Sequence, residues 1–129
     1  MNLNAFFAVG IGAALGAWLR WGVGMALNPL FLPIMLGTLV ANLVGGFLMG
    51  VILGVIHLSP GLSSTFRLFA TTGFLGGLTT FSTFSGEAFG LIQRGDWGWL
   101  GVHIVSHVAG SLLATWAGYA MLQTLKGSY

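Results

Sequence analysis

Four long apolar stretches, separated by short polar turns, account for nearly the whole chain. They cover residues 4–27, 34–57, 66–93 and 97–125, and each is long enough for a helix to cross a bilayer, which takes about 20 residues. Turn-forming residues separate them at Asn28-Pro29, Ser59-Pro60-Gly61 and Arg94-Gly95-Asp96. No alternation typical of strands appears. The pattern predicts an all-α integral membrane protein, with one four-helix transmembrane domain over residues 1–129.

The third stretch differs from an ordinary lipid-facing helix. It contains Gly76-Gly77 and Thr79-Thr80, followed by hydroxyls at Ser82, Thr83 and Ser85. Glycine inside a helix costs about 1 kcal/mol relative to alanine, and irregular backbone persists at membrane depth only where protein buries it or it lines a wet cavity. We therefore expect this helix to be broken at mid-membrane, with carbonyls and hydroxyls facing other protein or an ion path. Close helix packing through small residues is the alternative.

Composition agrees with a membrane protein and excludes several classes of site. Only 5% of the 129 residues are charged, and the mean hydropathy is +0.94, whereas soluble domains are about one quarter charged. The chain has no cysteine, which excludes disulfides and thiolate metal ligands. The net charge of +2 comes without a basic cluster, so no nucleic-acid partner is expected.

Two polar residues stand out in the first two stretches. Arg20 either extends to the membrane interface or lies at the mouth of a water-filled vestibule, where it would attract anions. Asn42 lies four residues before Gly46, on the same helix face as a stripe that continues through Gly50 and Gly54. A carboxamide deep in a span needs a partner, so Asn42 either clasps a neighbouring helix or donates to a polar path.

The fourth stretch has one polar face. His103, His107 and Ser111 recur every four residues. Two histidines one turn apart are compatible with a metal site, but the sequence places no third ligand of matching type beside them. We therefore expect His103 to be hydrogen-bonded or interfacial rather than a metal ligand.

The distribution of Lys and Arg leaves the orientation in the membrane unspecified. Four spans place both termini on one side, together with Arg67 and Lys126, whereas Arg20 and Arg94 lie on the other. Without a positive-inside bias, single copies are expected to insert both ways. Two antiparallel copies would bury both broken helices, as in inverted-repeat transporters. The sequence thus predicts a dual-topology homodimer.

Three segments resemble the signature of the microbial Fluc (CrcB) fluoride channels. They are Gly16-Ala-Trp-Leu-Arg20-Trp21, Gly37-Thr-Leu-Val-Ala-Asn42-Leu-Val-Gly-Gly46 and, most specifically, Gly73-Phe-Leu-Gly-Gly-Leu-Thr-Thr-Phe-Ser-Thr-Phe-Ser-Gly-Glu87. The resemblance implies an antiparallel homodimer in the plasma (inner) membrane, with two pores for passive export of cytoplasmic fluoride. It also implies a structural sodium ion, bound by the backbone carbonyls of Gly76 and Thr79 from both copies.

The resemblance also implies roles for individual side chains. The pore-lining positions that match the family pattern are Asn42, Phe81, Phe84, Ser82, Thr83, Glu87 and Ser111, with Arg20 at the vestibule and His107 where some relatives carry tyrosine. Fluoride is small and strongly hydrated, so N–H and O–H donors must replace its water. Phenylalanine ring edges carry partial positive charge and can face an anion without trapping it. No enzymatic chemistry is expected.

Other functions remain as alternatives. A small dual-topology multidrug transporter needs a carboxylate in the first span, whereas the only membrane carboxylate here is Glu87 in the third. An intramembrane serine hydrolase would use Ser82 or Ser85 with His107, but no oxyanion-hole motif accompanies them. A purely structural membrane subunit is the remaining alternative.

Overall fold

Three long helices form most of the molecule. The computed structural model describes residues 2–127, in which α1 (Leu3–Leu27), α2 (Leu36–Leu58) and α6 (Trp97–Lys126) are long and apolar enough to cross a membrane. The short 3₁₀ helix η1 (Asn28–Leu30) continues α1 into the first turn. No strand occurs in the described residues. The prediction of an all-α, multi-pass membrane protein is therefore confirmed, and these three helices lie close to the predicted ranges.

The third predicted stretch is not one continuous α-helix. It consists of α3 (Ser64–Leu68), the π-helical segment η2 (Phe69–Leu75), α4 (Gly76–Leu78) and α5 (Phe81–Arg94). Between α4 and α5, Thr79 and Thr80 have extended backbone, with ψ of 156° and 118°. We call these two residues the interruption. Ser63 begins the stretch as a cap, because its Oγ accepts the N–H of Phe66 at 3.1 Å.

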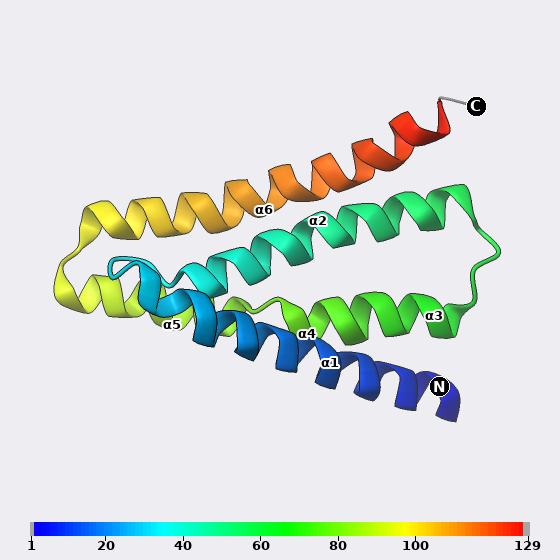
Figure 1. Ribbon diagram of the computed structural model, residues 1–129, viewed down its shortest axis with the longest axis horizontal. Coiled ribbons are helices and arrows are strands. Elements are labelled where there is room, and N and C mark those ends of the chain that lie inside the picture. The colour runs from blue at the N-terminus through cyan, green and yellow to red at the C-terminus, as the bar shows by residue number, and fades with distance from the viewer. Residues whose placement is uncertain (1, 128–129) are drawn as a thin grey trace.

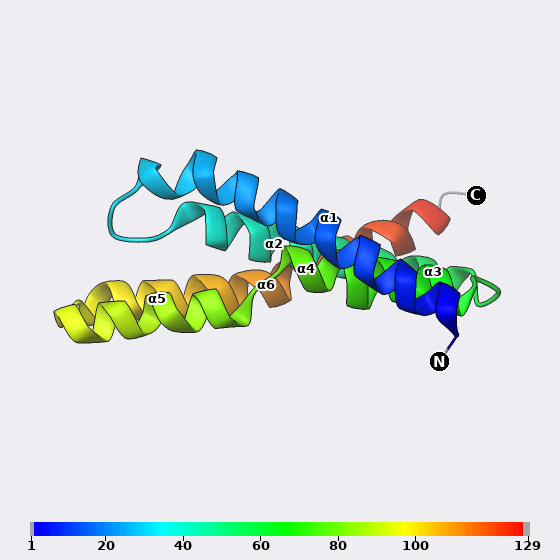
Figure 2. The same ribbon diagram turned by 90° about the horizontal axis from the view of Figure 1, so that it is seen from below.

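The helices pack in pairs. α2 lies along α6, α1 packs against η2 and α4, and α5 packs against α6. Figure 1 shows both termini at the same end of the molecule as α3, while the α1–α2 and α5–α6 turns lie at the opposite end. Figure 2 shows α1 crossing the region of η2 and α4. The interruption therefore lies between the two ends of the molecule along its long axis.

Glycines on α1 bring that helix close to the irregular segment. A Cβ added to Gly12 would lie 2.7 Å from the carbonyl oxygen of Phe69, and one added to Gly16 would overlap the carbonyl oxygen of Phe74. Backbone contacts of this kind exclude any side chain. Gly12 and Gly16 thus allow close contact between α1 and the irregular segment.

A second set of glycines fits α2 against α6. A Cβ added to Gly46 would lie 2.9 Å from the carbonyl oxygen of Ser111, and one added to Gly54 would lie 2.8 Å from Cβ of Leu122. Gly50, between them, faces the backbone of Thr115. The glycine stripe is therefore the surface on which α6 rests, and it holds Ser111 beside α2.

Candidate functional site

Asn42 connects α2 to the interruption. Its Oδ1 accepts the backbone N–H of Thr80 at 2.8 Å, and its Nδ2 donates to the carbonyl of the same residue at 3.1 Å. The second N–H of Nδ2 points to Nδ1 of His107, 3.0 Å away. Because the two bonds to Thr80 fix which end of the amide is Nδ2, Nδ1 of His107 accepts and Nε2 carries the proton.

Both N–H groups of Asn42 are thus already used within the chain. Of the two roles expected for Asn42, the structure shows the one in which it binds neighbouring segments, here Thr80 and His107. Direct donation from Asn42 to an anion stays a prediction, and it would require one of these hydrogen bonds to open.

The interruption redirects two backbone donors. In a continuous helix the carbonyl of Gly76 would accept the N–H of Thr80, but that N–H bonds Asn42 instead. The carbonyl of Thr79 would accept the N–H of Thr83, which bonds the capping hydroxyl of Thr80 at 3.1 Å. The two carbonyls predicted to hold a cation are therefore those whose helical partners are bonded elsewhere.

A cavity of about 440 Å³ lies between α2, the interruption and α6. Most of the predicted site residues meet at its wall. Those that line it are Asn42, Gly76, Thr79, Phe81, Phe84, His107 and Ser111. The structure thus brings together residues from three separate stretches, and no Lys, Arg, Asp or Glu is among those that line the cavity.

Aromatic rings cover one side of this region. The ring of Phe84 stacks on His103, with centroids 4.8 Å apart and planes at 9°, and lies 4.9 Å from the ring of His107. Phe81 lies 5.5 Å from Phe84 and is 78% exposed. Phe84 is therefore held by its neighbours, whereas most of the Phe81 ring is left uncovered by the described residues.

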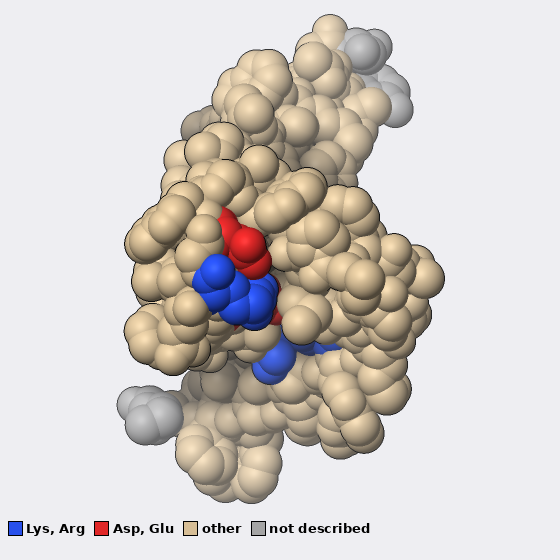
Figure 3. Space-filling view, turned by 90° about the vertical axis from the view of Figure 1, so that its left-hand side faces the viewer, with Lys and Arg blue, Asp and Glu red and all other residues tan. Residues whose placement is uncertain are grey.

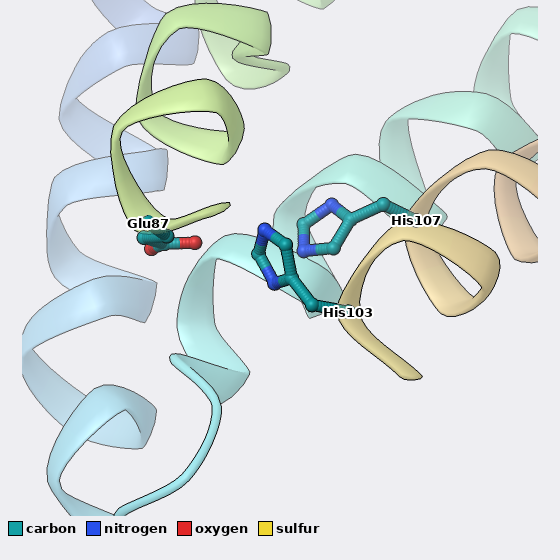
Figure 4. Close-up of side chains that lie close together, drawn as sticks. All are labelled: Glu87, His103 and His107. Atoms are coloured by element: carbon teal, nitrogen blue, oxygen red, sulfur yellow. The ribbon is translucent and has the colours of Figure 1, made fainter. Parts of the chain in front are cut away.

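Glu87 lies close to the two histidines of α6 (Figure 4). One Oε atom accepts the hydroxyl of Thr38 at 2.6 Å, and ligand-type atoms of Glu87, His103 and His107 lie within 4.8 Å of one another. The expectation that no third ligand lies near the histidine pair is wrong, because folding brings α5 alongside α6. His103 is fully buried and donates from Nε2 to the carbonyl of Phe84 at 3.0 Å, so it is hydrogen-bonded rather than interfacial.

Arg20 lies on the other side of the interruption. Its Nε donates to the carbonyl of Gly77 at 3.0 Å, and it lines a cavity of about 370 Å³ together with Thr38, Thr80 and Thr83. A third cavity of about 400 Å³ contains Thr83, Glu87 and His103. Ser82 is exposed and lines none of these three cavities in the described part of the chain.

Sequence reasoning did not identify the partners of three residues that build the site. Thr38 binds Glu87, Thr80 binds Asn42, and Thr115 donates to the carbonyl of Gly46 at 2.9 Å. Thr38 lies four residues before Asn42 on the same face of α2, a spacing that was visible in the sequence. Nothing in the sequence indicated the partners of the other two.

Comparison with known proteins identifies the family. Residues 7–119 match the model of the family described as CrcB-like protein, Camphor Resistance (CrcB). A protein of Aromatoleum aromaticum named fluoride-specific ion channel FluC is 62% identical over 98% of this chain and 96% of its own length. Proteins of the same name from Nitrosospira multiformis and Pseudomonas putida are 54% and 51% identical, each over 97% of this chain and 98% of their own length. The chain therefore belongs to the CrcB family.

Proposed function

We propose that this protein is a fluoride-selective channel through which cytoplasmic fluoride leaves the cell passively. The observation that most directly supports the proposal is the identity, over nearly the full length, with relatives named fluoride-specific ion channels. The geometry agrees, because neutral donors and phenylalanine rings line the central cavity without a charged side chain. An anion that passes neutral donors is weakly held at each step, which permits exit as well as entry.

The residues of the proposed pore supply what a dehydrating fluoride ion needs. The hydroxyls of Ser82, Thr83 and Ser111 are donors, and the Nε2–H of His107 is a buried donor that has no partner within the described part of the chain. Asn42 fixes the proton on that nitrogen by donating to Nδ1. The ring edges of Phe81 and Phe84 offer partial positive charge between the donors. Arg20 attracts anions toward the entrance, and Glu87 completes the polar track beyond Phe84.

The channel is proposed to consist of two antiparallel copies in the plasma (inner) membrane, with one pore beside each. Within one chain, Phe81 and many other large apolar side chains remain exposed. A second copy on a two-fold axis in the membrane plane would cover part of this surface and would place the two interruptions together at mid-membrane. Balanced Lys and Arg placement supports insertion of copies in both orientations.

A structural sodium ion would fit between the two copies. Its ligands would be the carbonyls of Gly76 and Thr79, whose helical N–H partners are bonded to Asn42 and to Thr80. Hard cations prefer such oxygen ligands, and unpaired carbonyls in a membrane interior would otherwise cost several kcal/mol each. When bound, the ion supplies positive charge near the pores and joins the copies.

The test is ion flux from liposomes that contain the purified protein. We expect fluoride to leave rapidly when a potassium ionophore balances the charge, and chloride to stay inside. Protein-free liposomes are the control, and a fluoride electrode is the readout. Absence of fluoride flux from correctly assembled protein would overturn the proposal, and proton-coupled drug export would favour the multidrug-transporter alternative.

A further inference from the structure

Two buried histidines and a half-buried glutamate form a cluster beside the central cavity. His103 and His107 lie one turn apart on α6 and are 0% and 4% exposed, and Glu87 reaches them from α5. Figure 4 shows the Glu87 carboxylate pointing toward the two imidazole rings. Buried ionisable groups are costly unless something pairs with them, so the cluster needs an explanation.

Each of the three side chains has one anchored atom and one without a partner. The anchored atoms are an Oε of Glu87 with Thr38, Nε2 of His103 with the carbonyl of Phe84, and Nδ1 of His107 with Asn42. The buried atoms of the cluster that have no hydrogen-bond partner among residues 2–127 are Oε2 of Glu87, Nδ1 of His103 and Nε2 of His107. These atoms belong to the three residues whose ligand-type atoms lie within 4.8 Å of one another.

We propose that Glu87, His103 and His107 form a binding site for a divalent transition-metal ion, with Zn²⁺ as the best fit. Two histidines at this spacing on one helix face and a carboxylate are a common zinc set, with an open fourth position. Ligand atoms around tetrahedral zinc lie about 3.3 Å apart, so atoms within 4.8 Å of one another would have to approach by up to about 1.5 Å when the ion binds. The anchoring bonds to Thr38 and Phe84 orient the ligands, as partners outside the coordination shell do in metal sites.

An approach to the site exists at the turn end of the molecule. The cavity of about 400 Å³ that contains Glu87 and His103 also reaches Arg94 in the last turn of α5. Figure 3 shows this end, where acidic and basic side chains gather at the centre of an otherwise uncharged face. The cavity gives a cation access to Glu87 and His103 from this end, past a wall that also contains apolar residues such as Leu32 and Ile34.

Binding at His107 would act on the interruption. Nε2 of His107 carries a proton while Nδ1 accepts from Asn42, so a metal ion requires the proton to move to Nδ1. That shift breaks the Asn42–His107 hydrogen bond, and Asn42 also holds Thr80. On the proposed channel function, the ion would therefore stop fluoride flux, both by this rearrangement and by occupying the polar track.

Metal binding is tested directly on the untagged protein in detergent. Titration with Zn²⁺ by calorimetry should give one site per chain, and Co²⁺ should show the absorption bands of tetrahedral coordination that Zn²⁺ then abolishes. His103→Gln and Glu87→Gln should each weaken Zn²⁺ binding at least about tenfold. His57→Gln is the matched control, because His57 lies in the last turn of α2, far from the cluster, and it should bind Zn²⁺ as the wild type does.

The outcomes separate this inference from the channel proposal. No saturable Zn²⁺ binding below about 1 mM, equal to −4.1 kcal/mol, or unchanged binding in both cluster variants, overturns the site even if fluoride flows. If either variant fails to fold, the Co²⁺ spectrum of the wild type decides. Zn²⁺ binding without any fluoride flux in its absence overturns the channel instead. In liposomes, Zn²⁺ should inhibit fluoride flux through the wild type. The His103→Gln variant should retain a larger fraction of the flux that it shows without Zn²⁺. Equal retained fractions in the two proteins would overturn the proposed inhibition by Zn²⁺ at this site.

Discussion

The three hydrogen bonds of Asn42 make a quantitative prediction. Asn42→Ala removes bonds of 2.8, 3.1 and 3.0 Å and leaves the backbone of Thr80 and Nδ1 of His107 without them. At a net value of about 1 kcal/mol each, the free energy of unfolding should fall by about 3 kcal/mol. Asn42→Asp keeps an acceptor for the Thr80 N–H, but it loses both donors and turns a carboxylate toward two acceptors. We expect Asn42→Asp to abolish fluoride flux, because an acceptor-only group also repels the anion.

Equilibrium unfolding in mixed micelles, followed by circular dichroism, measures the first effect, and liposome flux measures the second. Gln123→Ala is the matched control, because it also removes a carboxamide, but one whose Nε2 has no hydrogen-bond partner in the part of the chain that the structure describes. If the free energy of unfolding of Asn42→Ala lies within about 0.5 kcal/mol of the wild-type value, the Asn42 hydrogen bonds do not stabilise the fold as proposed. Near-normal flux in an assembled Asn42→Asp protein would instead refute a role of Asn42 in the pore.

Three further predictions concern packing and assembly. Gly50→Ala should lower the free energy of unfolding by about 1–3 kcal/mol, because its Cβ would overlap the backbone of Thr115. Gly10→Ala is the control and should not lower it, because no described atom lies within 4 Å of the added Cβ. Equal unfolding curves for the two variants would contradict this prediction. Gly76→Val should reduce dimer formation on size-exclusion chromatography more than it changes fluoride-over-chloride selectivity, since a β-branched residue resists the backbone that the sodium site needs; normal dimers would argue against that site. A C-terminal tag probed in intact cells should be found on both sides of the membrane, and labelling on one side alone would contradict dual topology.

Local chemistry explains which features were predictable. Apolar length and the turn residues at Asn28-Pro29 and Arg94-Gly95-Asp96 predicted the helices, because a span needs only length and apolarity. The spacing of Gly46, Gly50 and Gly54 predicted one glycine face on the second helix, because residues four apart share one face. The motif around Gly73–Glu87 predicted the family. Each of these inferences depends on residues near one another in the chain.

The partners within the site depended on the tertiary structure. Periodicity placed His103 and His107 on one face of a helix, but it did not show that Glu87 faces them from α5 or that His103 is fully buried. It also left open whether Asn42 clasps a helix or lines a path, and the bonds to Thr80 became visible only with both segments in place. The sequence by itself determined the class of protein, the helices and the family, because these follow from local composition and spacing. Which polar groups meet was decided by helix packing, because it joins residues that lie far apart in the chain.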